Sequence, residues 1–265
     1  MNSNKLAFRD FFTAKDIAEP IISVTEEDAE RINYYFNVKN FDVLAFRKGN
    51  SVTGYIAKQS FKSDSWKNNV HKFDIKDLVS VNTPLVECIQ ILKTQERLFI
   101  IDRSSIISII TRSDIEKPAV RMLFYGLITS FESSIATIIK KLYPEGTWQS
   151  ILKENRIKKA IKEYNNLKSK NRENDLLDCT QFCDKTDILM SNPEHLIQYI
   201  ELSKNKAKGL FKKSRELRDD LSHAQPLYSW FETRELYAIL EHLQLILHNI
   251  ENEYKIADET QYILK

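Results

Sequence analysis

The sequence contains few cysteines and no long apolar run. Its three cysteines, Cys88, Cys179 and Cys183, are too few for a disulfide framework, and no Cys or His partners stand at zinc-ligand spacing. We therefore expect small buried side chains and no metal site. No apolar run approaches the roughly 20 residues of a membrane helix, and the first residues, MNSNKLAFRDFF, lack the apolar region of a signal peptide. These absences predict a cytoplasmic protein without a membrane partner.

An excess of charge of one sign is also missing. Lys and Arg number 39 and Asp and Glu number 37, so the formal net charge is only +2. This balance gives no overall attraction to nucleic acid, and any such site must come from local clustering. The content of 42% hydrophobic and 29% charged residues is typical of a globular chain. Because 265 residues exceed what one hydrophobic core usually serves, we expect two domains.

Residues 1–117 alternate β-branched runs with short helical patterns, and the pattern occurs twice. In each copy it predicts a strand, a helix and a two-stranded hairpin. The expected elements of the first copy are residues 21–24, 25–39, 42–48 and 51–58. Those of the second copy are residues 78–81, 84–95, 97–102 and 106–111. Residues 62–69 between the copies are polar and predict a surface linker.

The end of each copy carries the signature of a known family. The first ends Gly54-Tyr-Ile-Ala57-Lys-Gln-Ser60, and the second ends Ser108-Ile-Ile-Thr111-Arg-Ser-Asp114. With the repeat, these segments resemble a tandem pair of cystathionine-β-synthase (CBS) domains with the pattern Gly-x-x-Thr-x-x-Asp. The resemblance implies an adenine nucleotide as an allosteric ligand, with Thr111 near a phosphate and Asp114 on the ribose. Because the first copy has Ala57 and Ser60 at these positions, we expect at most one well-formed nucleotide site.

Two other interpretations of the repeat stay open. Thr111 and Asp114 can form a strand end followed by a helix cap, since Thr and Asp are favoured there whatever the function. The pair can also serve only as a dimerisation platform.

Residues 118–265 have helical periodicity throughout. The predicted helices are residues 119–142, 148–170, 174–190, 205–222 and 231–254. The expected fold class is therefore a two-domain chain, with an α+β domain over residues 1–117 and an all-α helical bundle over residues 118–265.

One stretch of the helical half combines groups that suit RNA chemistry. Arg218 offers a planar fork of donors for a phosphate, and His223 can exchange a proton near neutral pH. Asp219 follows the arginine and supplies an acceptor. The preceding basic run predicts contacts with RNA phosphates. It consists of Lys206, Lys208, Lys212, Lys213 and Arg215.

With its Arg-x4-His spacing, the helical half resembles the HEPN family. This resemblance implies a metal-independent endoribonuclease in which two copies of the motif face each other in a homodimer. His223 then acts as acid or base, Arg218 stabilises charge on the phosphoryl oxygens, and Asp219 orients one of them. The products are a 2′,3′-cyclic phosphate and a 5′-hydroxyl, and no catalytic cofactor is needed. Coupled to a nucleotide sensor, such an enzyme suits a toxin, a stress effector or an anti-phage effector.

Helix geometry agrees with a site shared between two chains. Positions five apart lie about 140° round the helix axis and about 7.5 Å along it, so Arg218 and His223 do not share a face. Alternatives stay open for this stretch too. It can be a solvated helix end whose arginine pairs with a neighbouring carboxylate. The whole chain can likewise be a non-catalytic nucleotide-sensing regulator that dimerises, or a protein-binding or RNA-binding dimer without turnover.

Overall fold

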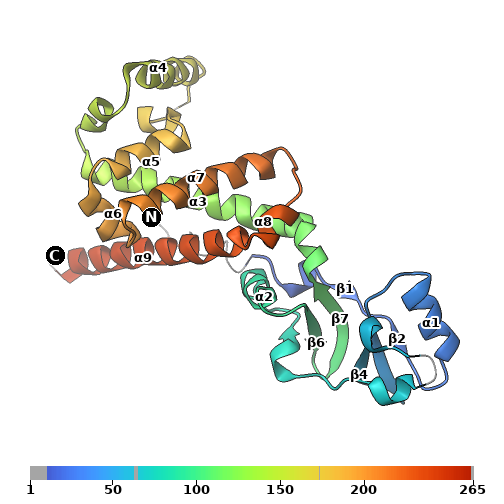
Figure 1. Ribbon diagram of the computed structural model, residues 1–265. Coiled ribbons are helices and arrows are strands. Elements are labelled where there is room, and N and C mark those ends of the chain that lie inside the picture. Colours follow the sequence, from blue (N-terminus) through green and yellow to red (C-terminus); the bar gives the residue numbers. More distant parts are fainter. Residues whose placement is uncertain (1–10, 63–64, 173, 264–265) are drawn as a thin grey trace. The chain divides into compact units, whose positions relative to one another are not determined.

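The computed structural model describes residues 11–62, 65–172 and 174–263 (Figure 1). Contacts separate these residues into two compact units, 11–120 and 121–263. The first unit is built from short strands and helices, and the second from helices. Each unit is described by itself.

The first unit contains two copies of one β-α-β-β motif. The first copy comprises β2 (Ser23–Val24), α1 (Ala29–Asn37), β3 (Val43–Lys48) and β4 (Ser51–Ala57). The second comprises β5 (Leu78–Ser80), α2 (Leu85–Leu92), β6 (Arg97–Asp102) and β7 (Ser105–Thr111). In each copy the first strand runs parallel to the second, and the second pairs antiparallel with the third. The repeat predicted from the sequence is confirmed.

The two hairpins match residue for residue at an offset of 54 positions. The strand register shifts once in each, between Phe46 and Arg47 in the first copy and between Ile100 and Ile101 in the second. The first turn is closed by Gly49, whose φ of 59° lies in the left-handed region that glycine adopts without strain. Sequence alternation and turn chemistry act locally, and for this reason both hairpins could be predicted.

Each copy pairs its last strand with the segment that precedes the other copy. The short strand β1 (Glu19–Pro20) lies before the first copy and pairs antiparallel with β7. Tyr55 of β4 forms an antiparallel bridge with His71, which precedes the second copy. This exchange joins the copies into one unit. It also explains why position 54 is a glycine, because a Cβ atom there would lie 2.5 Å from the backbone oxygen of His71.

Replacing Gly54 with alanine is therefore expected to destabilise the first unit. Overpacking against backbone costs about 1–3 kcal/mol, because backbone cannot rotate away as a side chain can. Chemical denaturation of Gly54→Ala and of Ser108→Ala, the matched position of the second copy, measures the difference. Equal stability of the two variants would show that the backbone at His71 moves aside without lowering the free energy of unfolding.

The segment between the two copies is not a surface linker throughout, so that prediction was wrong in part. Trp66 is only 3% exposed and belongs to the core of the first copy, with Phe36, Leu44 and Phe46. Its ring centroid lies 6.0 Å from that of Phe46 in an edge-to-face arrangement. The prediction failed because it used the average polarity of the stretch, whereas a single indole ring buries a large apolar area.

The second unit is all helical. Its helices are α3 (Pro118–Leu142), α4 (Glu154–Lys168), α5 (Phe182–Met190), α6 (Pro193–Ile200), α7 (Lys204–Ser222), α8 (Tyr228–Glu232) and α9 (Glu235–Ile263). The sequence analysis missed α6, although Asn192 caps it and Pro193 opens it. It also joined α8 to α9, which separate at Arg234, whose φ is 61°. Short helices held by tertiary packing give a weak periodic signal.

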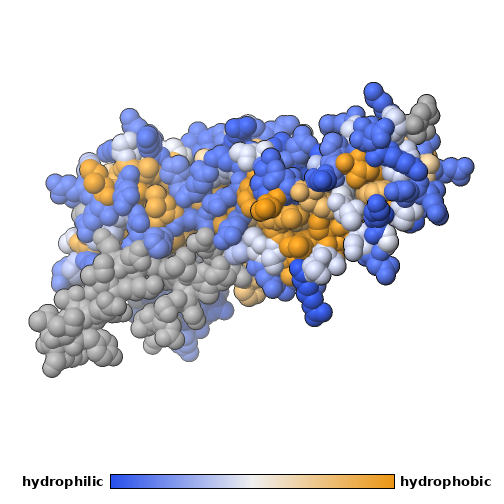
Figure 2. All heavy atoms as spheres, turned by 90° about the horizontal axis from the view of Figure 1, so that it is seen from below, coloured by the Kyte–Doolittle hydropathy of each residue, from blue (hydrophilic) through white to orange (hydrophobic). Residues whose placement is uncertain are grey.

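The long helix α3 lies at the centre of this core. Phe131 of α3 packs against Phe182 of α5 and Phe211 of α7, with ring centroids 6.2 and 5.7 Å away. Within the described residues, α3 is the one helix long and apolar enough to cross a membrane, but more than half of its most apolar window is buried. The sequence analysis counted only consecutive apolar residues and therefore did not find that α3 is apolar enough on average to cross a membrane. Hydrophobic residues also reach the surface in patches (Figure 2), and Met122 and Tyr125 of α3 are 55% and 46% exposed.

The cysteines differ from one another in burial. Cys88 is buried as expected, and burial raises the pKa of its thiol to about 12. Cys179 and Cys183 are only partly buried, and Arg156 Nη2 donates to Cys183 Sγ at 2.8 Å. Across residues 11–62, 65–172 and 174–263, the structure shows no group of three or more His, Cys, Asp or Glu side chains placed to hold a metal ion.

Candidate functional site

A pocket of about 390 Å³ lies where β4 of the first copy meets the segment before the second copy. The side chains that give it chemical character are Tyr55, Ser60, His71, Asp77, Glu96 and Arg97. They come from both copies, so the exchange of segments that joins the repeat also builds the pocket. A few polar groups converging in a pocket of several hundred Å³ are typical of a small-molecule site.

The wall of this pocket is aromatic. The rings of Tyr55 and His71 stack with centroids 5.1 Å apart and planes at 26°, and Phe99 supports Tyr55 from a centroid distance of 4.8 Å. The guanidinium of Arg97 lies 6.0 Å from the centre of the Tyr55 ring, and one of its amino groups forms an ion pair with the exposed carboxylate of Glu96. His71 Nε2 is also 3.0 Å from Ser60 Oγ. The arrangement offers a flat ring surface beside a cation, which together suit a planar heterocycle that carries a phosphate.

At the predicted residues Thr111 and Asp114 of the second copy, an internal cation already engages the carboxylate. Asp114 is 6% exposed, and its Oδ2 accepts from the Thr111 amide at 2.7 Å and from Thr111 Oγ1 at 3.1 Å. Its Oδ1 lies 2.8 Å from Lys117 Nζ, which also donates to Ile17 O at 2.5 Å and to Glu19. Partial burial opposes the charge of Lys117, but hydrogen bonds to Asp114 and Glu19 outweigh it and raise its pKa. A ribose can reach Asp114 only if Lys117 moves.

The first copy lacks this carboxylate. At the matching positions, Ser60 Oγ donates to Ala57 O at 3.0 Å, so a hydroxyl caps the turn where Asp114 caps it in the second copy. In the copy that keeps the Thr and Asp signature the carboxylate is therefore engaged, whereas the copy that departs from it borders the open pocket. Lys117 and Asp114 are only three positions apart, but Glu19, which also holds Lys117, is 98 positions away and could not be assigned to it from the sequence.

In the helical unit, α7 holds Arg218 and Asp219 side by side. Arg218 Nη1 lies 3.3 Å from Glu132 Oε2 and its Nη2 lies 3.4 Å from Asp219 Oδ1. The guanidinium also lies 5.6 Å from the centre of the Phe182 ring. His223 is the exposed C-terminal cap of α7, and its amide donates to Asp219 O at 3.1 Å. Arg218 is thus committed to its own chain, as the alternative interpretation of this stretch expected.

Sequence reasoning missed the carboxylate that holds Arg218. Glu132 of α3 also lies 2.9 Å from Lys185 Nζ of α5, and Lys185 is only 4% exposed. Lys185 completes its hydrogen bonds on Thr180 O at 2.8 Å. One carboxylate therefore links two cations from two other helices. No local motif signals such a cluster, since its members are 53 and 86 positions apart.

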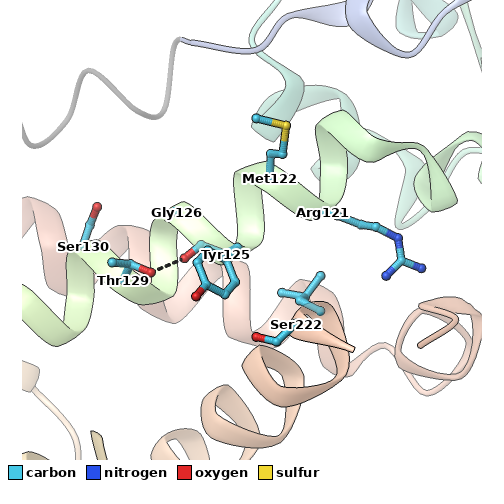
Figure 3. A pocket seen from close by; sticks show the side chains of 8 residues that line it. Arg121, Met122, Tyr125, Gly126, Thr129, Ser130 and Ser222 are labelled. Atoms are coloured by element: carbon cyan, nitrogen blue, oxygen red, sulfur yellow. Dashed lines mark hydrogen bonds between the residues drawn. The ribbon is translucent and has the colours of Figure 1, made fainter. Parts of the chain in front are cut away.

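A pocket of about 630 Å³ lies beside the predicted catalytic histidine (Figure 3). It is lined by Arg121, Tyr125 and Thr129 of α3 and by Ser222, the residue before His223. Arg121 projects from α3 toward the end of α7, and its Nη2 donates to Gln225 O at 2.8 Å. The sequence analysis did not single out Arg121, because nothing local to it marks the chemistry.

The predicted RNA-binding residues differ in exposure and in whether they form ion pairs within the chain. Lys206 and Lys208 are exposed on α7. Lys212 lies 3.7 Å from Glu216, and Lys213 forms an ion pair with Glu235. Arg215 is partly buried. An RNA contact through this run stays a prediction, and its exposed members are Lys206, Lys208 and Lys212.

Comparisons with known proteins find likenesses at the level of solved structures. No protein-family model matches the chain, and no curated protein matches it. A CBS domain-containing protein from Thermotoga maritima is 12% identical, with 39% of this chain and 91% of that chain covered and a TM-score of 0.31. Hypoxic Response Protein I with two coordinated zinc ions is 16% identical, with 40% and 97% covered and a TM-score of 0.31. The CBS domain of a bacterial CNNM/CorC family Mg²⁺ transporter is 9% identical, with 45% and 79% covered and a TM-score of 0.34.

Two of these three neighbours are described as CBS domain structures, and all three cover between 39% and 45% of this chain. None of the comparisons supports the resemblance to HEPN domains. The identities and TM-scores are low. We therefore base the proposed function on the geometry of the chain itself.

Proposed function

We propose that residues 11–120 form a nucleotide-sensing regulatory module of the tandem CBS type, which binds an adenine nucleotide in the open pocket of the first copy. The observation that carries this proposal is the convergence of the stacked rings of Tyr55 and His71 with Arg97 in one pocket of about 390 Å³. The repeated β-α-β-β topology and the exchanged segments support the same reading.

The parts of a nucleotide match the parts of this pocket. Adenine can stack on the aromatic wall, because a flat π-system gains both area burial and a favourable ring geometry there. Arg97 can bind a phosphate through charge-assisted hydrogen bonds from the guanidinium donors that Glu96 does not engage. Asp77 and Ser60 supply acceptors for ribose hydroxyls. No step of chemistry is required, which agrees with a regulatory role.

We expect AMP, ADP or ATP to raise the melting temperature of the full chain, because a ligand that binds the folded state stabilises it by about 2.7 kcal/mol at one hundred times Kd. Arg97→Gln should weaken binding of the phosphorylated ligand about 10–100-fold, since a hydrogen bond to a charged group contributes about 1.5–3 kcal/mol. Adenosine, which has no phosphate, should lose little with the same substitution. S-adenosylmethionine and cyclic nucleotides complete the ligand set.

Asp114→Ala is the matched control for the second copy. If it leaves binding unchanged while Arg97→Gln weakens it, the ligand occupies the first copy. The opposite result would place the ligand at Thr111 and Asp114, with Lys117 displaced. If no adenine ligand shifts the melting temperature, the repeat acts as a dimerisation platform and the sensor proposal fails.

A second candidate function is the metal-independent endoribonuclease, acting as a homodimer on RNA. One observation favours it: exposed His223 directly follows Ser222, which lines a pocket of about 630 Å³ that contains a guanidinium. In this arrangement that guanidinium belongs to Arg121, whereas Arg218 holds Glu132. His223 would move the proton at a ribose 2′-hydroxyl or at the leaving 5′-oxygen.

A further inference from the structure

A smaller pocket, of about 250 Å³, lies at the hairpin turns of the first unit and shares no residue with the nucleotide pocket. Its polar residues are Ser23, Arg47, Asn50 and Ser105. Its remaining walls are the apolar residues Ile21, Val52, Ile106 and Ile107. The first copy and the second copy both contribute, so the pocket exists only in the assembled repeat. No acidic side chain lines it.

Arg47 is the cation of this pocket, and two hydrogen bonds hold it there. Its Nε donates to Ser23 Oγ at 3.3 Å and its Nη1 donates to Asn50 O at 3.3 Å. Within the part of the chain that the structure describes, no carboxylate lies within ion-pair distance of it. A guanidinium has five N–H donors, so three remain for another partner. Partly burying a cation without an opposite charge costs free energy that an anion would recover.

The repeat shows that the fold itself does not need this arginine. Arg47 follows the register shift of the first hairpin, and the position 54 residues later, Ile101, follows the same shift in the second hairpin. A register shift of this kind re-aims a side chain, and such irregularities are frequent beside functional sites. Isoleucine satisfies the backbone geometry in one copy, so the charge in the other copy has a different cause.

We propose that this pocket binds a small phosphate-bearing anion through Arg47, with the hydroxyls of Ser23 and Ser105 as further donors. Ser23 Oγ already accepts from Arg47, which leaves its own proton to donate. A planar fork beside two hydroxyl groups matches the oxygens of a phosphate, and the isoleucine walls limit competing water. The volume is below the range typical of drug-sized ligands, so the phosphoryl group fills most of it. Asp102 pairs with Ser105 in the strand register but does not line the pocket.

The test is a titration of the full-length protein with inorganic phosphate by calorimetry, at constant ionic strength in chloride. We expect saturable binding that Arg47→Ile weakens by about tenfold or more, because charge-assisted hydrogen bonds are lost. Arg47→Ile places the residue of the second copy in the first, so the fold has a precedent for it. Lys48→Gln removes a neighbouring exposed charge and should leave the affinity unchanged.

Two further arms make the result decisive. Glycerol 3-phosphate in place of inorganic phosphate distinguishes a monoester ligand from free phosphate by which of the two binds more tightly. Arg47→Lys keeps the charge and loses the fork, and we expect it to recover only part of the affinity. The proposal is overturned if neither phosphate saturates a site, or if Arg47→Ile and Lys48→Gln change binding equally. Adenine-nucleotide binding should be unaffected by Arg47→Ile, so the two sites succeed or fail separately.

Discussion

Replacing Glu132 with alanine is expected to lower the free energy of unfolding of the helical unit by about 3 kcal/mol. Removing one partner of a buried ion pair leaves an uncompensated charge, which costs about 3–5 kcal/mol. Lys185 is almost fully buried, whereas the side chain of Glu132 keeps 23% exposure, so the lower end of the range applies. Arg218 loses the same partner in the same step. Denaturant unfolding followed by circular dichroism measures the change.

A surface ion pair of the same unit provides the control. Lys140 lies 3.1 Å from Asp178, but both side chains are more than 40% exposed, so Lys140→Ala should cost less than about 1 kcal/mol. The double variant Glu132→Leu with Lys185→Met should recover most of the lost stability, because it removes the buried charge of Lys185 together with its partner, and Arg218 keeps Asp219. If Glu132→Ala costs no more than Lys140→Ala, Glu132 does not hold the three helices together.

If the ribonuclease proposal is right, His223→Ala lowers RNA cleavage by about 10²–10⁴-fold, which is the usual contribution of a general acid or base. The fold should be unaffected, since His223 is an exposed helix cap. The measurement is incubation of the purified protein with total RNA in EDTA, followed by mapping of product ends for 2′,3′-cyclic phosphates and 5′-hydroxyls. His248→Ala, at another exposed histidine, is the control.

Variants of Arg121 and Arg218 test which of the two arginines would bind the phosphate in such a site. If the pocket beside His223 binds the phosphate, Arg121→Ala should lower cleavage at temperatures where the variant is still folded, although it also loses the hydrogen bond to Gln225 O. Arg218→Lys should be as inactive as Arg218→Ala if Arg218 is released from Glu132 to form the bidentate contact predicted from the sequence. Absence of cleavage by the wild-type protein, or equal cleavage by His223→Ala, would exclude this candidate and leave the regulatory module as the function.

The parts of this protein that could be predicted from the sequence are those that local interactions determine. Gly49 closes the first hairpin because it adopts a positive φ, and strand alternation does not depend on distant residues. The same holds for the helical stripe of α3 and for the repeat itself. Trp66 and α6 were misjudged because their order comes from packing against segments elsewhere in the chain.

The sequence by itself determined the β-α-β-β repeat, the helical half and the residues that can bind phosphate or exchange a proton. Only the tertiary structure decided which of those residues are available. Lys117 engages the nearby Asp114 and is itself held by the distant Glu19, and Glu132 of α3 engages Arg218 of α7. In both places a carboxylate from a distant part of the chain lowers the cost of partly burying a cation. At the open pocket, Arg97 has the exposed carboxylate of its neighbour Glu96 as counter-ion, whereas Arg47 has no carboxylate partner among the residues that the structure describes. The sequence shows which chemical groups are present, but the partners of each group depend on contacts between residues that are far apart in the chain.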